Sequence, residues 1–346
     1  MVFAVTIAAL QGLPNGATPA PAGLARLQAA HSRLAEHYDE FVRLMGKQSA
    51  ADLMQRLDDD IGDMMTDETP DSFTTAEWQT RLNGLAMLDS SIVEQIVSGK
   101  HEPIAGSKGL VERLIVTRSD HTLQPFAPYV PATLPAHPSL VVLLHGNPQT
   151  ETEILSGPYF QRLADETQTI VVAPYGRGIY DFAAPADDEV YQVTAAVVSA
   201  LEVDPQRVYL AGYSMGGFTV FKIGPEHAAQ WAAVMCIAGS VLNSGAAAVK
   251  SAFAHTRMYV VNGARDESIP PRYGELTAQW LAGVGIPTGF YQEPQGTHYL
   301  TTLMPVLSRA WHEMLAGYIG PEAQVRTSDE GASIPTQGPT VNGKGL

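Results

Sequence analysis

The sequence has one cysteine, few basic residues and no apolar run that approaches membrane-spanning length. Cys236 has no partner for an internal disulfide, and the run "WAAVMCIAGSV" predicts a small buried side chain rather than a nucleophile. Lys and Arg total 21 against 36 Asp and Glu, a net charge of −15. This balance argues against a nucleic-acid binder, which needs a basic surface for phosphates. No HExxH motif or cysteine cluster is present, so we expect neither a metal nor another cofactor.

The N-terminus also lacks a feature of secreted proteins. Its first basic residue is Arg26, so the positively charged start of a signal peptide is missing. We therefore expect a cytoplasmic protein without a membrane span, and export stays open as an alternative.

Residues 22–105 read as a helical region that follows an extension over residues 1–21. Apolar residues recur at helical spacing in two segments, and a third segment opens with Thr74 and Glu77, which are spaced as a capping box. The apolar positions are Leu27, Leu34, Tyr38, Phe41 and Met45, then Leu53, Leu57, Ile61 and Met64, and finally Trp78, Leu82, Leu85, Ile92 and Ile96. Plain packing explains these stripes, while a lid over a site further along and a dimer surface stay open.

From residue 106 to 320 the pattern changes to strand-like runs that alternate with helical stretches. The candidate strands are "LVERLIVT", "FAPYVPATL", "SLVVLLHG", "TIVVAPYG", "RVYLAGYS", "AAVMCIAGSV", "TRMYVVNGARD" and "TGFYQEPQ". Such alternation predicts a doubly wound, mostly parallel α/β sheet, whose ligands bind at the carboxyl ends of the strands. Residues 321–346 are polar and rich in Pro and Gly, and we expect them to be disordered.

The stretch "RVYLAGYSMGGFTVFKIG" places Ser214 between a strand and a helix. A serine on such a tight turn is exposed as a nucleophile, and Gly212 and Gly216 are needed where a Cβ would clash. The N–H of Met215, at the start of the helix, points to where negative charge would develop.

A serine hydroxyl needs a base and an acid to orient that base. His298, in "EPQGTHYLTTL", lies in a loop between the last strand and the last helix. Asp266, in "VNGARDESIP", follows the preceding strand, and the adjacent Glu267 is its main rival. The chain order Ser214, Asp266, His298 is that of α/β-hydrolases.

A second oxyanion donor is expected after "LVVLLHG". The N–H of Asn147 is the best candidate to pair with Met215, and Gln149 is the alternative, since Pro148 has no N–H. His145 is expected to brace this loop. Tyr175, Tyr180 and Phe182 either contribute aromatic contacts to the cleft or fill the core.

From about residue 110 to 320 the chain resembles an α/β-hydrolase. The segments "LVVLLHG", "DPQRVYLAGYSMGGF", "VNGARDESIP" and "GTH" are similar to those of esterase D-like, feruloyl esterase and polyhydroxybutyrate depolymerase-like enzymes. This resemblance implies a serine hydrolase that uses Ser214, Asp266 and His298, with Asn147 and Met215 as oxyanion donors. The helical region matches no part of that pattern.

Together these features predict a carboxylic ester hydrolase that acts through an acyl-enzyme on a small-molecule ester and works without a cofactor. A serine peptidase of the prolyl-oligopeptidase type and a non-catalytic, hydrolase-like binding module are the alternatives. The sequence leaves open whether the protein forms a homo-oligomer.

Overall fold

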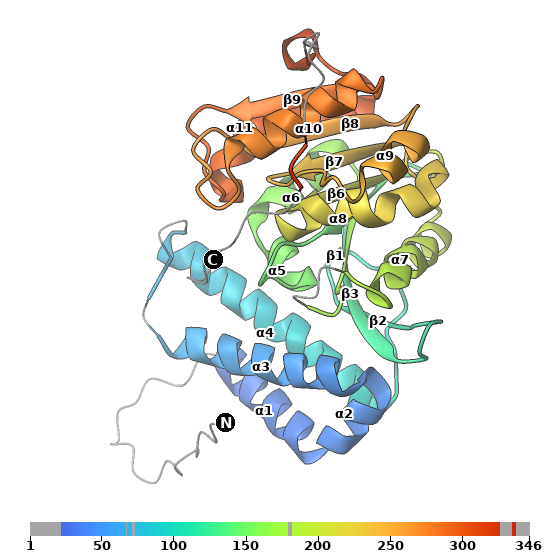
Figure 1. Ribbon diagram of the computed structural model, residues 1–346. Helices are drawn as coiled ribbons and strands as arrows, with labels where there is room; N and C mark the ends of the chain where they lie inside the picture. Colours follow the sequence, from blue (N-terminus) through green and yellow to red (C-terminus); the bar gives the residue numbers. More distant parts are fainter. Residues whose placement is uncertain (1–21, 67, 71–72, 179–181, 326–333, 337–346) are drawn as a thin grey trace.

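The computed structural model describes residues 22–66, 68–70, 73–178, 182–325 and 334–336. The expected extension over residues 1–21 lies outside this range. In Figure 1 the N-terminal helices form one group below an α/β unit that holds the rest of the chain.

Four helices make up the helical region, and α1 packs against both α3 and α4. They are α1 (Ala22–Glu36), α2 (Tyr38–Met45), α3 (Lys47–Met65) and α4 (Thr75–Ser98). The predicted capping box is confirmed, because the Thr74 side chain accepts from the Glu77 N–H while the Thr74 N–H donates to the Glu77 carboxylate. The first predicted stripe spans two helices, since α1 and α2 are separated at His37.

Nine strands form one sheet within the described part of the chain. They are β1 (Gly109–Leu110), β2 (Arg113–Val116), β3 (Leu123–Val130), β4 (Leu140–Leu144), β5 (Ile170–Pro174), β6 (Val208–Tyr213), β7 (Ala233–Ile237), β8 (Arg257–Gly263) and β9 (Thr288–Glu293). The order is β1-β3-β5-β4-β6-β7-β8-β9, with β2 also paired to β3. From β5 to β9 all pairings are parallel, while β3 runs antiparallel to β5. The predicted, mostly parallel sheet is therefore confirmed.

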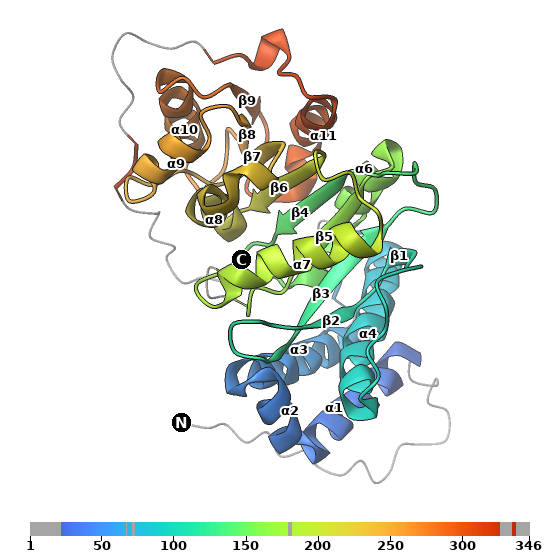
Figure 2. The same cartoon turned by 90° about the vertical axis from the view of Figure 1, so that its right-hand side faces the viewer.

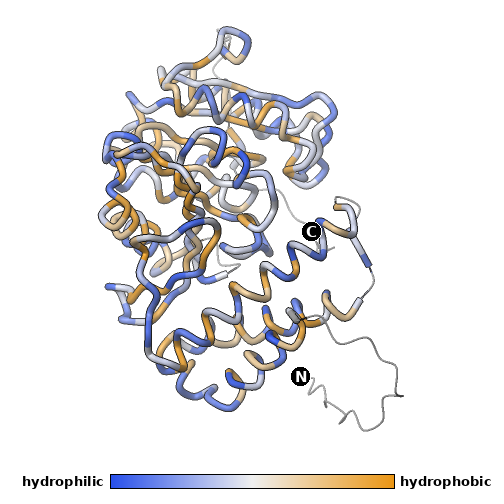
Figure 3. Tube along the Cα trace, turned by 180° about the vertical axis from the view of Figure 1, so that it is seen from behind, coloured by the Kyte–Doolittle hydropathy of each residue, from blue (hydrophilic) through white to orange (hydrophobic). Residues whose placement is uncertain are grey.

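Helices cover both faces of this sheet (Figure 2). They are α5 (Glu151–Ser156), α6 (Pro158–Thr167), α7 (Ala186–Ala200), α8 (Met215–Ile223), η1 (Gly224–Gln230), α9 (Ala246–Ala252), α10 (Pro271–Gly283), α11 (Leu300–Ala316) and η2 (Pro321–Ala323). One apolar core lies between the sheet and α5, α6 and α11, and a second lies between the sheet and α7 to α10. Figure 3 shows the same arrangement, with apolar strands inside and polar helix faces outside.

The helical region shares a core with the edge of the sheet. Its buried cluster, which includes Leu57 and Phe41, also contains Leu114 of β2 and Leu123 of β3. The packing of these helices is thus continuous with the α/β unit.

Five buried charged residues also lie at this junction: Arg56, Asp60, Asp89, Glu112 and Glu151, here called the Arg56 cluster. Arg56 forms ion pairs with Asp89 of α4 and with Glu151 of α5, the latter at 2.6 Å. It also donates to the Thr152 hydroxyl. A helix of the helical region is thereby tied to the first turn of α5.

Part of the expected disordered tail has structure. Residues 321–325 include η2, and Gln324 bridges to Gly289 of β9. Buried Ala323 packs into the core beside α11. Residues 326–333 and 337–346 lie outside the described residues.

Candidate active site

Ser214 lies on the turn between β6 and α8, with φ 53° and ψ −114°. A non-glycine residue adopts such a positive φ only when its surroundings hold it there. A Cβ on Gly212 would lie 2.1 Å from the Gly216 carbonyl oxygen, and one on Gly216 would lie 2.3 Å from that of Leu144. The predicted need for both glycines is confirmed, because strand and helix approach too closely for any side chain.

His298 contacts Ser214 from the loop that follows β9. It lies between β9 and α11, with its Nε2 2.9 Å from the Ser214 hydroxyl oxygen. Its Nδ1 is 2.8 Å from Oδ2 of Asp266. Because the carboxylate can only accept, Nδ1 carries the proton and Nε2 is left to accept from the serine.

The structure also separates Asp266 from its rival. Asp266 is buried after β8, and its Oδ1 accepts from the N–H groups of Ser268 and Ile269 at 2.9 and 2.7 Å. These bonds leave Oδ2 facing the imidazole. The neighbouring Glu267 is exposed and has no such contact among the described residues.

Tyr213 is a contact that the sequence did not predict. Its hydroxyl donates to the backbone carbonyl of His298 at 2.9 Å, and its ring lies 5.3 Å from the imidazole. Burial raises the pKa of the Tyr213 phenol well above its usual range, so the hydroxyl stays a donor. The sequence shows that Tyr213 directly precedes Ser214, but it carries no signal that Tyr213 contacts His298, which is 85 residues further along the chain.

The loop after β4 lies directly against the serine turn. A Cβ on Gly146 would be 3.1 Å from the Cβ of Ser214, and the Gly216 N–H donates to the His145 carbonyl at 3.1 Å. The loop that continues into Asn147 therefore begins beside the serine turn, and the Met215 N–H, at the first turn of α8, has no partner within the helix. Gln149, the alternative donor, is half-buried in the same loop.

His145 braces this loop as expected. Its buried ring contacts the carbonyl oxygen of Gly146 through Nδ1 at 2.9 Å and that of Tyr175 through Nε2 at 2.8 Å. The loops after β4 and β5 are therefore held together at the carboxyl edge of the sheet.

The three aromatic residues after β5 that were expected either in the cleft or in the core lie in different surroundings. Phe182 is fully buried with its ring 5.0 Å from that of His145, so it fills the core. Tyr175 is also buried, and its hydroxyl donates to Asp52 of α3 at 3.1 Å. Tyr180 lies outside the described residues.

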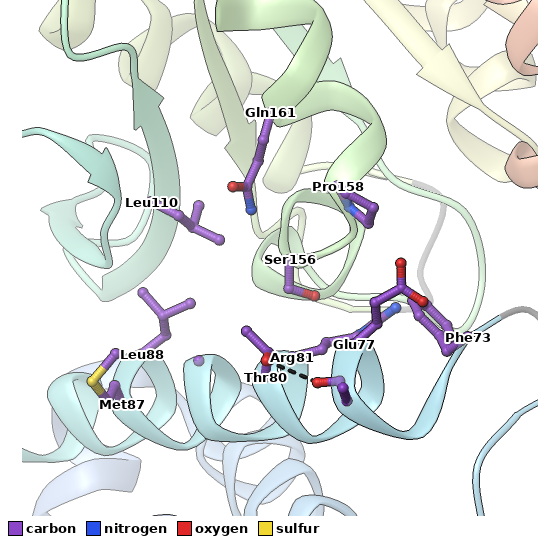
Figure 4. Close-up of a pocket in the computed structure, with 12 residues that line it drawn as sticks. Phe73, Glu77, Thr80, Arg81, Met87, Leu88, Leu110, Ser156, Pro158 and Gln161 are labelled. Atoms are coloured by element: carbon purple, nitrogen blue, oxygen red, sulfur yellow. Dashed lines mark hydrogen bonds between the residues drawn. The ribbon is translucent and has the colours of Figure 1, made fainter.

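Cavities lie between the helical region and the α/β unit. One of about 320 Å³ lies between α3 and the loops after β4 and β5. The other, of about 530 Å³, lies between α4 and the helices α5 and α6; Figure 4 shows its walls, with Arg81 and Leu88 below and Ser156 and Gln161 above. No residue that lines this larger cavity belongs to the Ser214 turn or to the loop after β4.

Among the described residues, no group of three or more His, Cys, Asp or Glu side chains is placed to hold a metal ion. In the same part of the chain, no helix is long and apolar enough to cross a membrane.

Comparison with known proteins identifies the fold. S-formylglutathione hydrolase of Staphylococcus aureus has 16% identity and a TM-score of 0.51, over 60% of this chain and 98% of its own. The fluorophosphonate-binding serine hydrolase F of the same organism has 16% identity and a TM-score of 0.50, with the same coverage. At these identities the likeness shows the fold alone.

A curated relative matches a shorter stretch. The bifunctional acetylxylan esterase/xylanase XynS20E of Neocallimastix patriciarum is 31% identical over 97 residues, which are 27% of this chain and 14% of that protein. The chain thus spans only a small part of that relative. The model of the alpha/beta hydrolase family matches residues 141–340, more than half of the chain. With Ser214 on the turn between β6 and α8 of a mostly parallel sheet, the chain belongs to the alpha/beta hydrolase family.

Proposed function

We propose that the chain is a serine carboxylic ester hydrolase that works through an acyl-enzyme on Ser214. The hydrogen-bonded line from Ser214 through His298 to Asp266 carries this proposal, because that geometry prepares a serine for attack on a carbonyl carbon. The name of the acetylxylan esterase relative favours an ester as the substrate.

In this mechanism His298 takes the Ser214 proton as the serine oxygen attacks the ester carbonyl. The N–H groups of Met215 and Asn147 stabilise the negative oxygen of the tetrahedral intermediate, each by roughly 3 kcal/mol. His298 then protonates the departing alcohol. It next removes a proton from the water that hydrolyses the acyl-enzyme and gives this proton to the departing Ser214 oxygen, while Asp266 stabilises the cationic imidazole.

The experiment is hydrolysis of p-nitrophenyl acetate and butyrate by wild type and Ser214→Ala. We expect kcat to fall by at least about 10⁴-fold, because no other group replaces the nucleophile. A fluorophosphonate should label wild type and leave the variant unlabelled. Full activity of Ser214→Ala, with an unchanged circular dichroism spectrum, would overturn the proposal.

The same experiments address the two alternatives. A prolyl-oligopeptidase-type peptidase would cleave aminoacyl anilides as well as esters, whereas an ester hydrolase would leave the anilides intact. The four helices of the described N-terminal region are unlike the propeller that such peptidases carry. A binding module would resist fluorophosphonate although its triad geometry is intact.

A further inference from the structure

The smaller cavity, here called the α3 pocket, is built by both parts of the protein. Leu53, Asp52 and Arg56 of α3 form one wall, and Pro148 and Tyr175, from the loops after β4 and β5, form the opposite wall. Its volume of about 320 Å³ is at the lower end of the range for small-molecule sites. The helical region therefore supplies half of a pocket at the carboxyl edge of the sheet.

This pocket is close to Ser214. Ser214 follows β6, Pro148 follows the adjacent strand β4, and Tyr175 follows β5, one strand further. A Cβ on Gly146 would lie 3.1 Å from the Cβ of Ser214, and Pro148 is two residues further along the same loop. Since two residues span at most about 7 Å, the pocket wall begins within roughly 10 Å of the serine. Pro148 also directly follows Asn147, the proposed oxyanion donor. A substrate held at Ser214 can reach the pocket with a side group of ordinary length.

The charged residues that line the pocket are mostly acidic. Asp52, Asp59 and Glu153 face it, and the one guanidinium, Arg56, is already paired with Asp89 and Glu151 behind the wall. Asp52 accepts from Gln48 at 2.7 Å and from the Tyr175 hydroxyl at 3.1 Å, and each of its oxygens can accept a further bond. The field inside the pocket is therefore negative.

The wall also has a polar atom without a protein partner. Oδ2 of Asp60 has none among the described residues, although this side chain is more than nine-tenths buried. Buried acceptors are rarely left unpaired, so a cationic occupant suits this wall better than an alkyl chain. Apolar Leu53 and Pro148 complete the lining and suit the methyl groups of a substituted ammonium.

We propose that the α3 pocket binds a positively charged, ammonium-type group of the substrate ester and thereby selects cationic esters over uncharged ones of the same shape. This assignment rests on the proposed ester hydrolysis and gives the helical region a role in specificity. The favourable interaction is electrostatic, so it should weaken as salt screens it.

The test compares two matched pairs of substrates. One pair is choline butyrate and its isostere with carbon in place of the quaternary nitrogen. The other is the p-nitrophenyl ester of a trimethylammonio-substituted acid and its all-carbon isostere. We expect the cationic member of at least one pair to have a kcat/KM about 10-fold higher, with the preference falling as ionic strength rises.

Asp52→Asn should remove about 10-fold from kcat/KM for the cationic ester and leave its uncharged isostere within about twofold. Asparagine still accepts from Tyr175, so the fold is kept, which thermal unfolding checks. Asp39→Asn is the matched control, because Asp39 is exposed on α2 and does not line the pocket.

Two outcomes would overturn the pocket assignment alone, once Ser214-dependent hydrolysis of the uncharged esters is seen. One is an equal kcat/KM for the cationic ester and its uncharged isostere in both pairs. The other is a preference for the cationic ester that Asp52→Asn leaves unchanged. Absence of hydrolysis for every ester, including p-nitrophenyl acetate, would overturn the proposed function and the pocket assignment with it.

Discussion

At the scale of single residues, Asp266 and Glu267 offer a matched comparison. We expect Asp266→Asn to lower kcat by about 10³- to 10⁴-fold, because an amide at this position favours the wrong imidazole tautomer. Glu267→Gln should stay within about twofold of wild type, since Glu267 is exposed and does not contact His298. Steady-state hydrolysis of p-nitrophenyl butyrate measures both. A larger loss in the Glu267 variant would contradict the assignment.

Glycines at the serine turn give a second prediction. In Gly216→Ala the new methyl group would lie 2.3 Å from the Leu144 carbonyl oxygen. We expect a loss of about 3 kcal/mol in the free energy of unfolding, measured in urea, together with lower activity. Gly62→Ala is the control: nothing lies within 4 Å of the new methyl on α3, and alanine should stabilise the helix by about 0.5 to 1 kcal/mol. Equal stability of the two variants would contradict the steric explanation.

The sequence predicted Ser214, Asp266 and His298 because each follows a strand in an order typical of one fold. The structure brings these three side chains together, and their catalytic role stays a proposal. The contacts of Tyr213 with the His298 carbonyl and of Asp52 with Tyr175 were not predictable. They join segments far apart in the chain, and a single sequence carries no signal for such pairs.

At the scale of elements, the Arg56 cluster joins α3 to α4 and α5, and Glu112, directly before β2, lies beside it. Two of its four carboxyl groups pair with the guanidinium, and burial of Glu112, next to Glu151, raises its pKa well above its usual range. Burial and the nearby Asp89 raise the pKa of Asp60 from 3.8 to about 10. The Asp60 carboxyl therefore holds a proton at neutral pH that the unfolded chain releases.

The proton on Asp60 predicts a pH dependence of stability. Because the folded state keeps the Asp60 proton, the stabilisation is fully present below about pH 4 and is lost as pH rises through about 10. Relative to Asp60→Asn, wild type should lose up to about 1.4 kcal/mol of unfolding free energy per pH unit between those limits. Urea denaturation across this range measures the slope. The variant Asp59→Asn, exposed on the same helix, is the control, and identical slopes for wild type and Asp60→Asn would contradict the prediction.

The long elements were the most predictable. Apolar runs identified eight strand segments, and apolar spacing identified the helices from α1 to α4. The helices α5, α6 and α9 were not predicted. The six-residue α5 and seven-residue α9 are too short to show a clear apolar period, and Gly157 and Pro158 interrupt the stretch over α5 and α6.

At the scale of the whole molecule, the helical region and the α/β unit share one apolar core through Leu114 and Leu123. We therefore expect both parts to unfold in one thermal transition, with the calorimetric enthalpy close to the van't Hoff value. Scanning calorimetry measures the ratio. Two resolved transitions, with the helices melting first, would contradict this and indicate a detachable lid.

Deleting residues 22–105 would expose the core that the helical region shares with the sheet. We therefore expect the deletion to lower the solubility of the protein and to alter its substrate specificity.

The placement of His145 has a mechanical consequence. Its ring nitrogens lie 2.9 Å from the carbonyl oxygen of Gly146 and 2.8 Å from that of Tyr175. One side chain therefore spans the loop that holds Asn147 and the residue that forms a wall of the α3 pocket. A change in the tilt of this ring would move the proposed oxyanion donor and the pocket wall together.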